Sequence, residues 1–163
     1  MLKMAFLKYI KMKKLIFSLV FPLTFISYFL FNKWWYVSII DAIDVNMYGF
    51  PLINCSPTLA TSMEFEYYVF ETIINVACFF TFWLAIVFTI NRFIKPIFIS
   101  NLIAKTCLVL LGFYLIGFTY CSIEFNTRFY FKRDWDIKIM DSGFEWIWQS
   151  PPTPDLNKYR PEK

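Results

Sequence analysis

Histidine is absent from the 163-residue chain, and this absence limits the chemistry that the other residues could perform. Without an imidazole there is no histidine metal ligand, no histidine-ligated haem and no Ser–His–Asp or Cys–His relay. General acid or base catalysis would then depend on carboxylates, lysine, tyrosine or cysteine. The sequence also has no Gly-rich phosphate-binding loop, so we expect neither a cofactor nor a metal site.

Glu71 is the ionisable residue in the most suggestive position, because it precedes a long uncharged run at 72–90. Asn75 follows one helical turn later and shares its face. A carboxylate inside a membrane is a candidate functional group because its burial is costly. Alternatively, Glu71 snorkels to the outer surface, and we expect Asn75 to form an interhelical hydrogen bond. Lys105 is expected to snorkel to the opposite, cytoplasmic surface.

The four cysteines are dispersed, and no CxxC pair exists, which argues against zinc-ribbon and thioredoxin-like sites. Cys55 and Cys121 are both expected on the outer side, where a disulfide between them is one possibility and free thiols are the other. The carboxylates of Glu64 and Glu66 match no known cation-binding loop. We therefore expect them to form a solvated acidic face.

The composition indicates which elements carry these residues. The chain is 58% hydrophobic and 17% charged, whereas a soluble domain is about 45–50% apolar and about 25% charged. The excess lies in uncharged runs at 15–31, 72–90 and 106–123. Each run can cross a hydrocarbon core as a helix. We predict transmembrane helices at 15–31, 67–91 and 102–123, the first being a retained signal-anchor rather than a cleaved signal peptide.

The charges beside these runs predict the orientation. Residues 1–14 carry five lysines and no acid, and the loop at 92–101 is also basic. The first loop carries one lysine against five acids up to Glu71. By the positive-inside rule the N-terminus is cytoplasmic, and the loop at 32–66 and the tail at 124–163 are extracytoplasmic. The basic residues therefore act as a topology signal, and we expect no nucleic-acid partner.

The outer loop begins with aromatic residues that suit an interfacial belt, namely Trp34, Trp35 and Tyr36. The following residues, up to 48, fit either a short amphipathic helix on the membrane surface or an irregular strand. The segment Gly49-Phe50-Pro51 then interrupts regular structure.

The tail changes to alternating apolar and polar residues. Residues 136–140 and 144–148 alternate around the turn signal Asp141-Ser142-Gly143, which predicts a β-hairpin within 124–150. Phe144, Trp146 and Trp148 would share one face and are candidates for binding a partner. Residues 151–163 are Pro-rich. The predicted fold is thus a mainly α membrane protein, with three transmembrane helices and a small extracytoplasmic cap that includes a C-terminal β-hairpin.

Residues 48–93 resemble a group of small uncharacterised bacterial membrane proteins. The resemblance rests on the Gly-Phe-Pro-Leu turn at 49–52, the Cys-Ser-Pro patch at 55–57, and a helix with Phe-Trp-Leu followed by Asn91-Arg92-Phe93. It implies a bacterial membrane protein and no particular activity, and we expect that membrane to be the bacterial inner membrane. An organellar origin has the same compositional bias and stays open.

The sequence leaves three functional hypotheses. We favour a non-enzymatic accessory, scaffold or partner-binding subunit in contact with the lipid bilayer and with protein partners in the membrane or on its outer side. The second is an immunity-type protein that binds a toxin at the outer face. The third is an enzyme or transporter component that uses Glu71.

Overall fold

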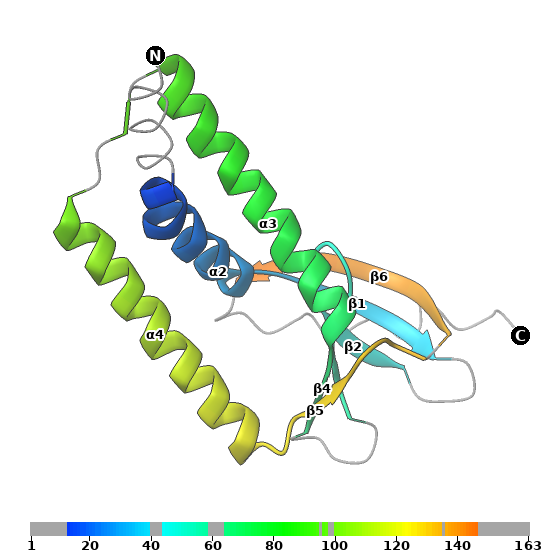
Figure 1. The fold of residues 1–163 in the computed structure, drawn as a ribbon. Helices are drawn as coiled ribbons and strands as arrows, with labels where there is room; N and C mark the ends of the chain where they lie inside the picture. The colour runs from blue at the N-terminus through cyan, green and yellow to red at the C-terminus, as the bar shows by residue number, and fades with distance from the viewer. Residues whose placement is uncertain are drawn as a thin grey trace, which may run out of the picture. The chain divides into compact units, whose positions relative to one another are not determined.

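The computed structural model describes residues 13–39, 44–58, 64–94, 96–97, 100–134 and 136–146. The chain divides into two compact units, one formed by Met1–Tyr28 with Val76–Cys121 and the other by Phe29–Asn75 with Ser122–Lys163. The first unit is helical, and the second holds all the strands that the structure describes (Figure 1).

In the part of the chain that the structure describes, three helices are long and apolar enough to cross a membrane, namely Lys13–Leu30, Val69–Ile94 and Asn101–Glu124. The first combines the π-helical segment Ile16–Val20 with α2, Phe21–Leu30. The second is α3, Val69–Thr89, which continues as the π-helical segment Ile90–Ile94, and the third is α4, Asn101–Glu124. All three overlap the spans that the sequence predicts.

Within the first unit, the N-terminal span packs on α3. The buried side chains of Leu15, Val20 and Val87 form an apolar cluster with partly buried neighbours that include Trp83. The Trp83 indole N–H donates to the Ser27 hydroxyl at 2.8 Å. This bond satisfies the one polar group of a large ring, so the indole can pack against apolar neighbours without an orphaned donor.

By contrast, α4 buries only Ala104 and Leu111 among its side chains. Its large apolar residues, such as Leu102, Phe113 and Ile116, are exposed. A helix that is apolar all round and exposed all round is unstable in water and stable in hydrocarbon.

The second unit is a six-stranded mixed sheet in the order β5-β4-β3-β2-β1-β6. Its strands are β1 (Phe31–Ile39), β2 (Val45–Tyr48), β3 (Cys55–Pro57), β4 (Phe65–Tyr68), β5 (Arg128–Tyr130) and β6 (Ile137–Trp146). Every neighbouring pair is antiparallel except β4 and β5, which are parallel. The expectation of a mainly α protein with a small cap is therefore wrong, because this sheet is a major part of the fold.

The predicted hairpin at 136–148 is also wrong. The described residues 137–146 form one long strand, β6, which pairs antiparallel with β1. The register passes from Val37 opposite Ile139 to Tyr36 opposite Asp141, so Met140 is the extra residue of a β-bulge. Gly143 is required here by close packing rather than by a turn, because a Cβ at this position would lie 2.7 Å from the Trp34 ring.

The segment after the first span is strand β1, so the irregular-strand alternative is nearer to the structure than the surface helix. Trp34 and Tyr36 are buried in the sheet unit, which corrects their assignment to an interfacial belt. On the other face of β1, Val37 and Ile39 form the core with Met47 and Ile53. Aromatic and β-branched side chains favour a strand buried on both faces.

Candidate functional site

The most ordered polar arrangement in the sheet unit joins the β2–β3 connection to the start of α3. Asn75 is fully buried. Its side-chain oxygen accepts from the Leu52 N–H at 2.9 Å, and its Nδ2 donates to the Leu52 carbonyl at 2.7 Å. The expected interhelical bond is therefore replaced by a bidentate contact with a loop backbone.

A second set of bonds fixes the same loop. Asn54 Nδ2 donates to the Thr72 hydroxyl at 3.0 Å, and the Tyr68 N–H donates to the Asn54 carbonyl at 2.9 Å. Gly49 has φ +135°, and a Cβ there would lie 2.2 Å from Asn54 Oδ1. The Gly-Phe-Pro-Leu segment thus serves to hold the loop against α3, a role that the sequence alone does not assign to it.

Glu71 lies in the first turn of α3 and is only 8% exposed. Its Oε2 has no hydrogen-bond partner among the residues that the structure describes. The positive end of the helix dipole favours a carboxylate at this position. Glu71 is therefore a buried acid in the sheet unit with one carboxylate oxygen that no described residue satisfies.

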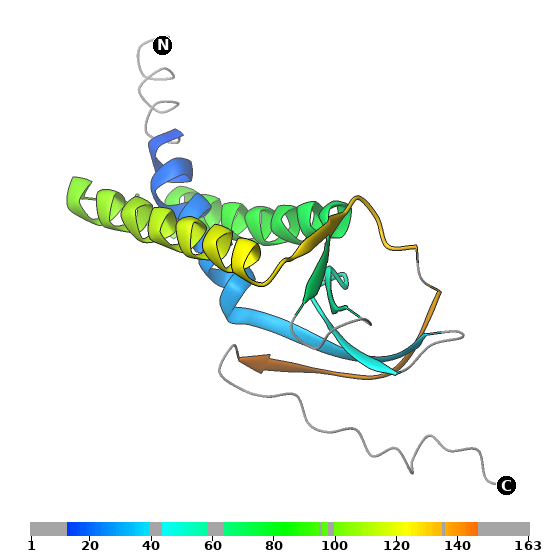
Figure 2. The same ribbon diagram turned by 90° about the horizontal axis from the view of Figure 1, so that it is seen from below.

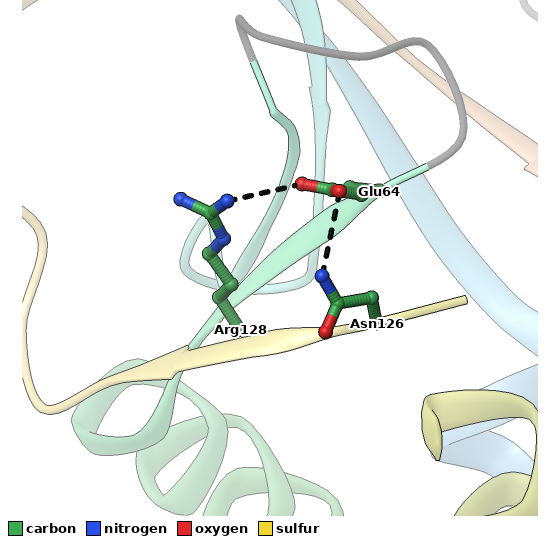
Figure 3. Close-up of polar contacts among 3 residues, drawn as sticks. All are labelled: Glu64, Asn126 and Arg128. Atoms are coloured by element: carbon green, nitrogen blue, oxygen red, sulfur yellow. Dashed lines mark hydrogen bonds and ion pairs between the residues drawn. The ribbon is translucent and has the colours of Figure 1, made fainter. Parts of the chain in front are cut away.

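The parallel pair β4–β5 is joined by an ionic contact that the sequence did not suggest. Arg128 Nη2 lies 3.4 Å from Glu64 Oε2, and Asn126 Nδ2 donates to Glu64 Oε1 at 3.5 Å (Figure 3). Glu64 precedes β4, whereas the other two residues follow α4. The contact therefore ties two distant segments together, which no local spacing in the sequence could reveal.

The expected acidic face is not solvated at Glu66, which is buried. It lies opposite Ser56 of β3 and two residues before Tyr68. Burial raises the pKa of Tyr68 to about 12, and the neighbouring negative charge of Glu66 adds to the effect. The phenol is consequently neutral across the physiological pH range.

All four cysteines are free thiols in the structure, so it contains no bond between Cys55 and Cys121. Burial raises the pKa of the Cys55 thiol to about 12, against a smaller opposing effect of a hydrogen bond with Tyr67. A thiol held in the neutral form is a poor nucleophile. Cys55 therefore behaves as a small apolar residue within the sheet.

An aromatic cluster, defined by Phe31, Phe50 and Phe144, lies on the sheet where the chain leaves the first span. The ring centroids are 5.0 Å apart for Phe31 and Phe144, and 5.5 and 5.3 Å from each of these to Phe50. Lys33 Nζ lies 3.6 Å from the Trp35 ring centroid beside them. Phe31 is 37% exposed and Phe144 is 55% exposed, so the cluster presents apolar surface.

Lys105 is exposed on α4, Trp146 ends β6 opposite Phe31, and Trp148 lies outside the described residues. No group of three or more metal-ligating side chains occurs in the part of the chain that the structure describes.

No known protein family, characterised protein or solved structure matches this chain. The chain combines three helices capable of crossing a membrane with a mixed β-sheet unit that carries an exposed aromatic cluster.

Proposed function

We propose that the chain is a non-enzymatic integral membrane protein that holds its sheet unit at one membrane surface, where the sheet binds a protein partner. The observation that carries this proposal is the aromatic cluster of Phe31, Phe50 and Phe144, in which Phe31 and Phe144 are exposed and Phe50 is partly buried. Rigid aromatic groups held by a sheet supply much contact area at little entropic cost, and they are enriched at protein interfaces.

The membrane in this proposal is a bacterial inner membrane, with a cytoplasmic N-terminus and an extracytoplasmic sheet. The strand pairing supports such a topology. β1 to β4 precede α3, whereas β5 and β6 follow α4, and all six belong to one sheet. Strands in one sheet lie on one side of a bilayer, so α3 and α4 must both cross it or neither can. Their apolar length favours crossing.

A photo-crosslinking amino acid at position 144 tests the partner-binding function in native membranes. Position 131 is the matched control, because Phe131 is also an exposed aromatic residue of the sheet unit but lies outside the cluster. We expect a discrete protein adduct from position 144 and none from position 131. Adducts with lipid alone at position 144 would contradict the proposal.

The orientation is tested with a membrane-impermeant maleimide and single added cysteines. In sealed right-side-out vesicles, Lys138→Cys should react at once, and Lys13→Cys should react only after permeabilisation. The unmodified chain measures the background from its own cysteines. Labelling in the opposite order would refute this orientation.

A second candidate function is supported by one observation, the unpartnered Oε2 of buried Glu71. An acid of this kind can receive a cation, as in a transport component. Infrared difference spectra on addition of Na⁺ or K⁺ should then show a carboxylate shift that Glu71→Gln removes and Glu64→Gln retains. If neither cation shifts the carboxylate bands, the candidate is eliminated.

A further inference from the structure

We propose that two copies of the chain associate through the open edges of β6, in antiparallel pairing and in one defined register. The inference rests on the proposed function, because it treats the sheet as an interaction module. It goes further by naming the partner as a second copy and the contact as a β-ladder.

β6 offers a long edge for such pairing. It has ten residues, it pairs with β1 along its length, and it ends the strand order on that side. No other described strand lies beyond it, as Figure 2 also shows. A long open edge is a template for strand addition, which proteins either block or use.

The backbone groups that face outward can be assigned from the register. The Gly49 N–H donates to the Lys33 carbonyl, so odd-numbered residues of β1 direct their polar groups toward β2. The even-numbered residues therefore face β6, and their register partners on β6 face inward. The outward-facing positions are then 137, 139, 142, 144 and 146.

The outward N–H in the middle of this edge already has a partner. The outward N–H of Ser142 donates to Asp141 Oδ1 at 2.8 Å. Pairing with another strand therefore depends on the two ends of β6, at Ile137 and Ile139 on one side and at Phe144 and Trp146 on the other. The side chains of Ile139 and Phe144 are both more than half exposed.

The sequence of β6 is self-complementary between these two ends. Placing Ile139 opposite Phe144 of the second copy also places Lys138 opposite Glu145 and Ile137 opposite Trp146. By two-fold symmetry each of these pairs occurs twice. Opposite charges and pairs of aromatic with β-branched residues are the cross-strand combinations that stabilise antiparallel ladders.

The bulge at Met140 is what permits this register. Two-fold related antiparallel strands pair residues that lie on the same face, and in a regular strand such residues are separated by an even number of positions. Ile139 and Phe144 are five positions apart. The bulge inserts one residue between them, so that both lie on the face of β1 that carries Lys33 and Val37.

The nearest alternative register is worse. A shift of two positions places Ile137 opposite Phe144, Lys138 opposite Gly143 and Ile139 opposite Ser142. Both charge pairs and half of the apolar pairs are then lost.

A charge exchange tests the register in the full-length protein in nanodiscs. Lys138→Glu places two acids opposite each other at both ends of the ladder, and so does not preserve either charge pair. Its dimer affinity should fall by about tenfold or more. Glu145→Lys should do the same, and the double variant Lys138→Glu with Glu145→Lys should restore the affinity. If the double variant regains the dimer affinity, the single variants lost it through the charge pair and not because they failed to fold.

Disulfide trapping between two differently tagged copies gives an independent measurement. One copy carries Ile139→Cys and the other Phe144→Cys, whose Cα atoms would lie about 5.5 Å apart in a hydrogen-bonded antiparallel pair. The matched control places Ile139→Cys on both copies, about 14 Å apart along the ladder, because the bulge leaves four ladder steps between positions 139 and 144. We expect oxidation to join the mixed pair and not the control pair.

A monomer in nanodiscs at every concentration, an unrestored double variant, or crosslinking of the control pair alone would each overturn the inference. The proposed function fails separately. A monomeric chain that still gives a foreign protein adduct at position 144 refutes self-pairing and leaves partner binding standing, whereas lipid adducts alone at that position contradict partner binding.

Discussion

Replacing Asn75 by leucine should destabilise the sheet unit, because it removes both hydrogen bonds to the backbone of Leu52. Leucine has a similar volume, so the main effect is to leave the Leu52 N–H and carbonyl without partners. An orphaned buried polar group costs about 1–3 kcal/mol, so two groups would cost about 2–6 kcal/mol. Leu52 is 39% exposed, which lets water reach the freed groups. We therefore expect the lower part of this range, about 2–3 kcal/mol.

This loss is measurable as a change in thermal stability. For a chain of this size, 1 kcal/mol corresponds to about 2–4 °C in Tm, so Asn75→Leu should lower Tm by about 4–12 °C. Intrinsic tryptophan fluorescence in detergent follows the transition. Limited proteolysis at 49–54 reports on the same loop and should become faster.

The matched control is Thr81→Val on the same helix. The Thr81 hydroxyl donates to the Ala77 carbonyl within the helix, so its removal orphans no group. Tm should then change by the equivalent of about 0.5 kcal/mol or less. If Asn75→Leu behaves like Thr81→Val in both assays, the bidentate contact does not hold the loop and the reasoning is refuted.

Three further predictions concern the sheet. Gly143→Val should lower the free energy of unfolding by about 1–3 kcal/mol in chemical denaturation, because its side chain overlaps the Trp34 ring. Stability should fall as pH rises from about 9 to about 12, because Cys55 and Tyr68 stay protonated in the folded state while their unfolded counterparts ionise; the pH dependence of Tm measures this. Arg128→Ala should cost less than about 1 kcal/mol and lose its effect in high salt, because the ion pair is partly exposed.

Each of these has its own control. Gly112→Val changes a glycine with no atom within 4 Å of the added Cβ, and should leave the sheet unaffected. The alkaline loss should become shallower in Cys55→Ala and in Tyr68→Phe, and an unchanged slope in both would contradict the assignment. A large salt-independent effect of Arg128→Ala would show that the ion pair acts as a buried one.

The helices were predictable because a bilayer imposes a simple requirement, about 20 apolar residues in succession, which a sequence displays directly. The sheet was not predictable, because several of its paired strands, such as β1 and β6, are far apart in the sequence. β3, β4 and β5 are three or four residues long, too short for a clear alternating pattern. The Asp141-Ser142-Gly143 segment has the composition of a turn, but in the structure it continues strand β6. It follows the bulge at Met140, and Gly143 leaves room for the Trp34 ring.

The candidate site was partly predictable. Asn75 and Glu71 stood out because polar groups are rare in apolar runs. Their contacts could not be predicted. The Asn75 side chain forms hydrogen bonds with the backbone of Leu52, and the sequence does not show which backbone groups a side chain will contact. The partnership of Glu64 with Arg128 depends on the parallel pairing of β4 with β5, which only the fold reveals.

The strand order has a consequence for how the protein is made. The four central strands are synthesised before α3, but both outer strands, β5 and β6, come after α4. During synthesis β1 and β4 are therefore unpaired edge strands, and β1 stays unpaired on one side until β6 has been made. The sheet is completed only after β5 and β6 have been synthesised, so a chain released between α3 and β5 would carry two unpaired strand edges and would be a substrate for quality-control proteases.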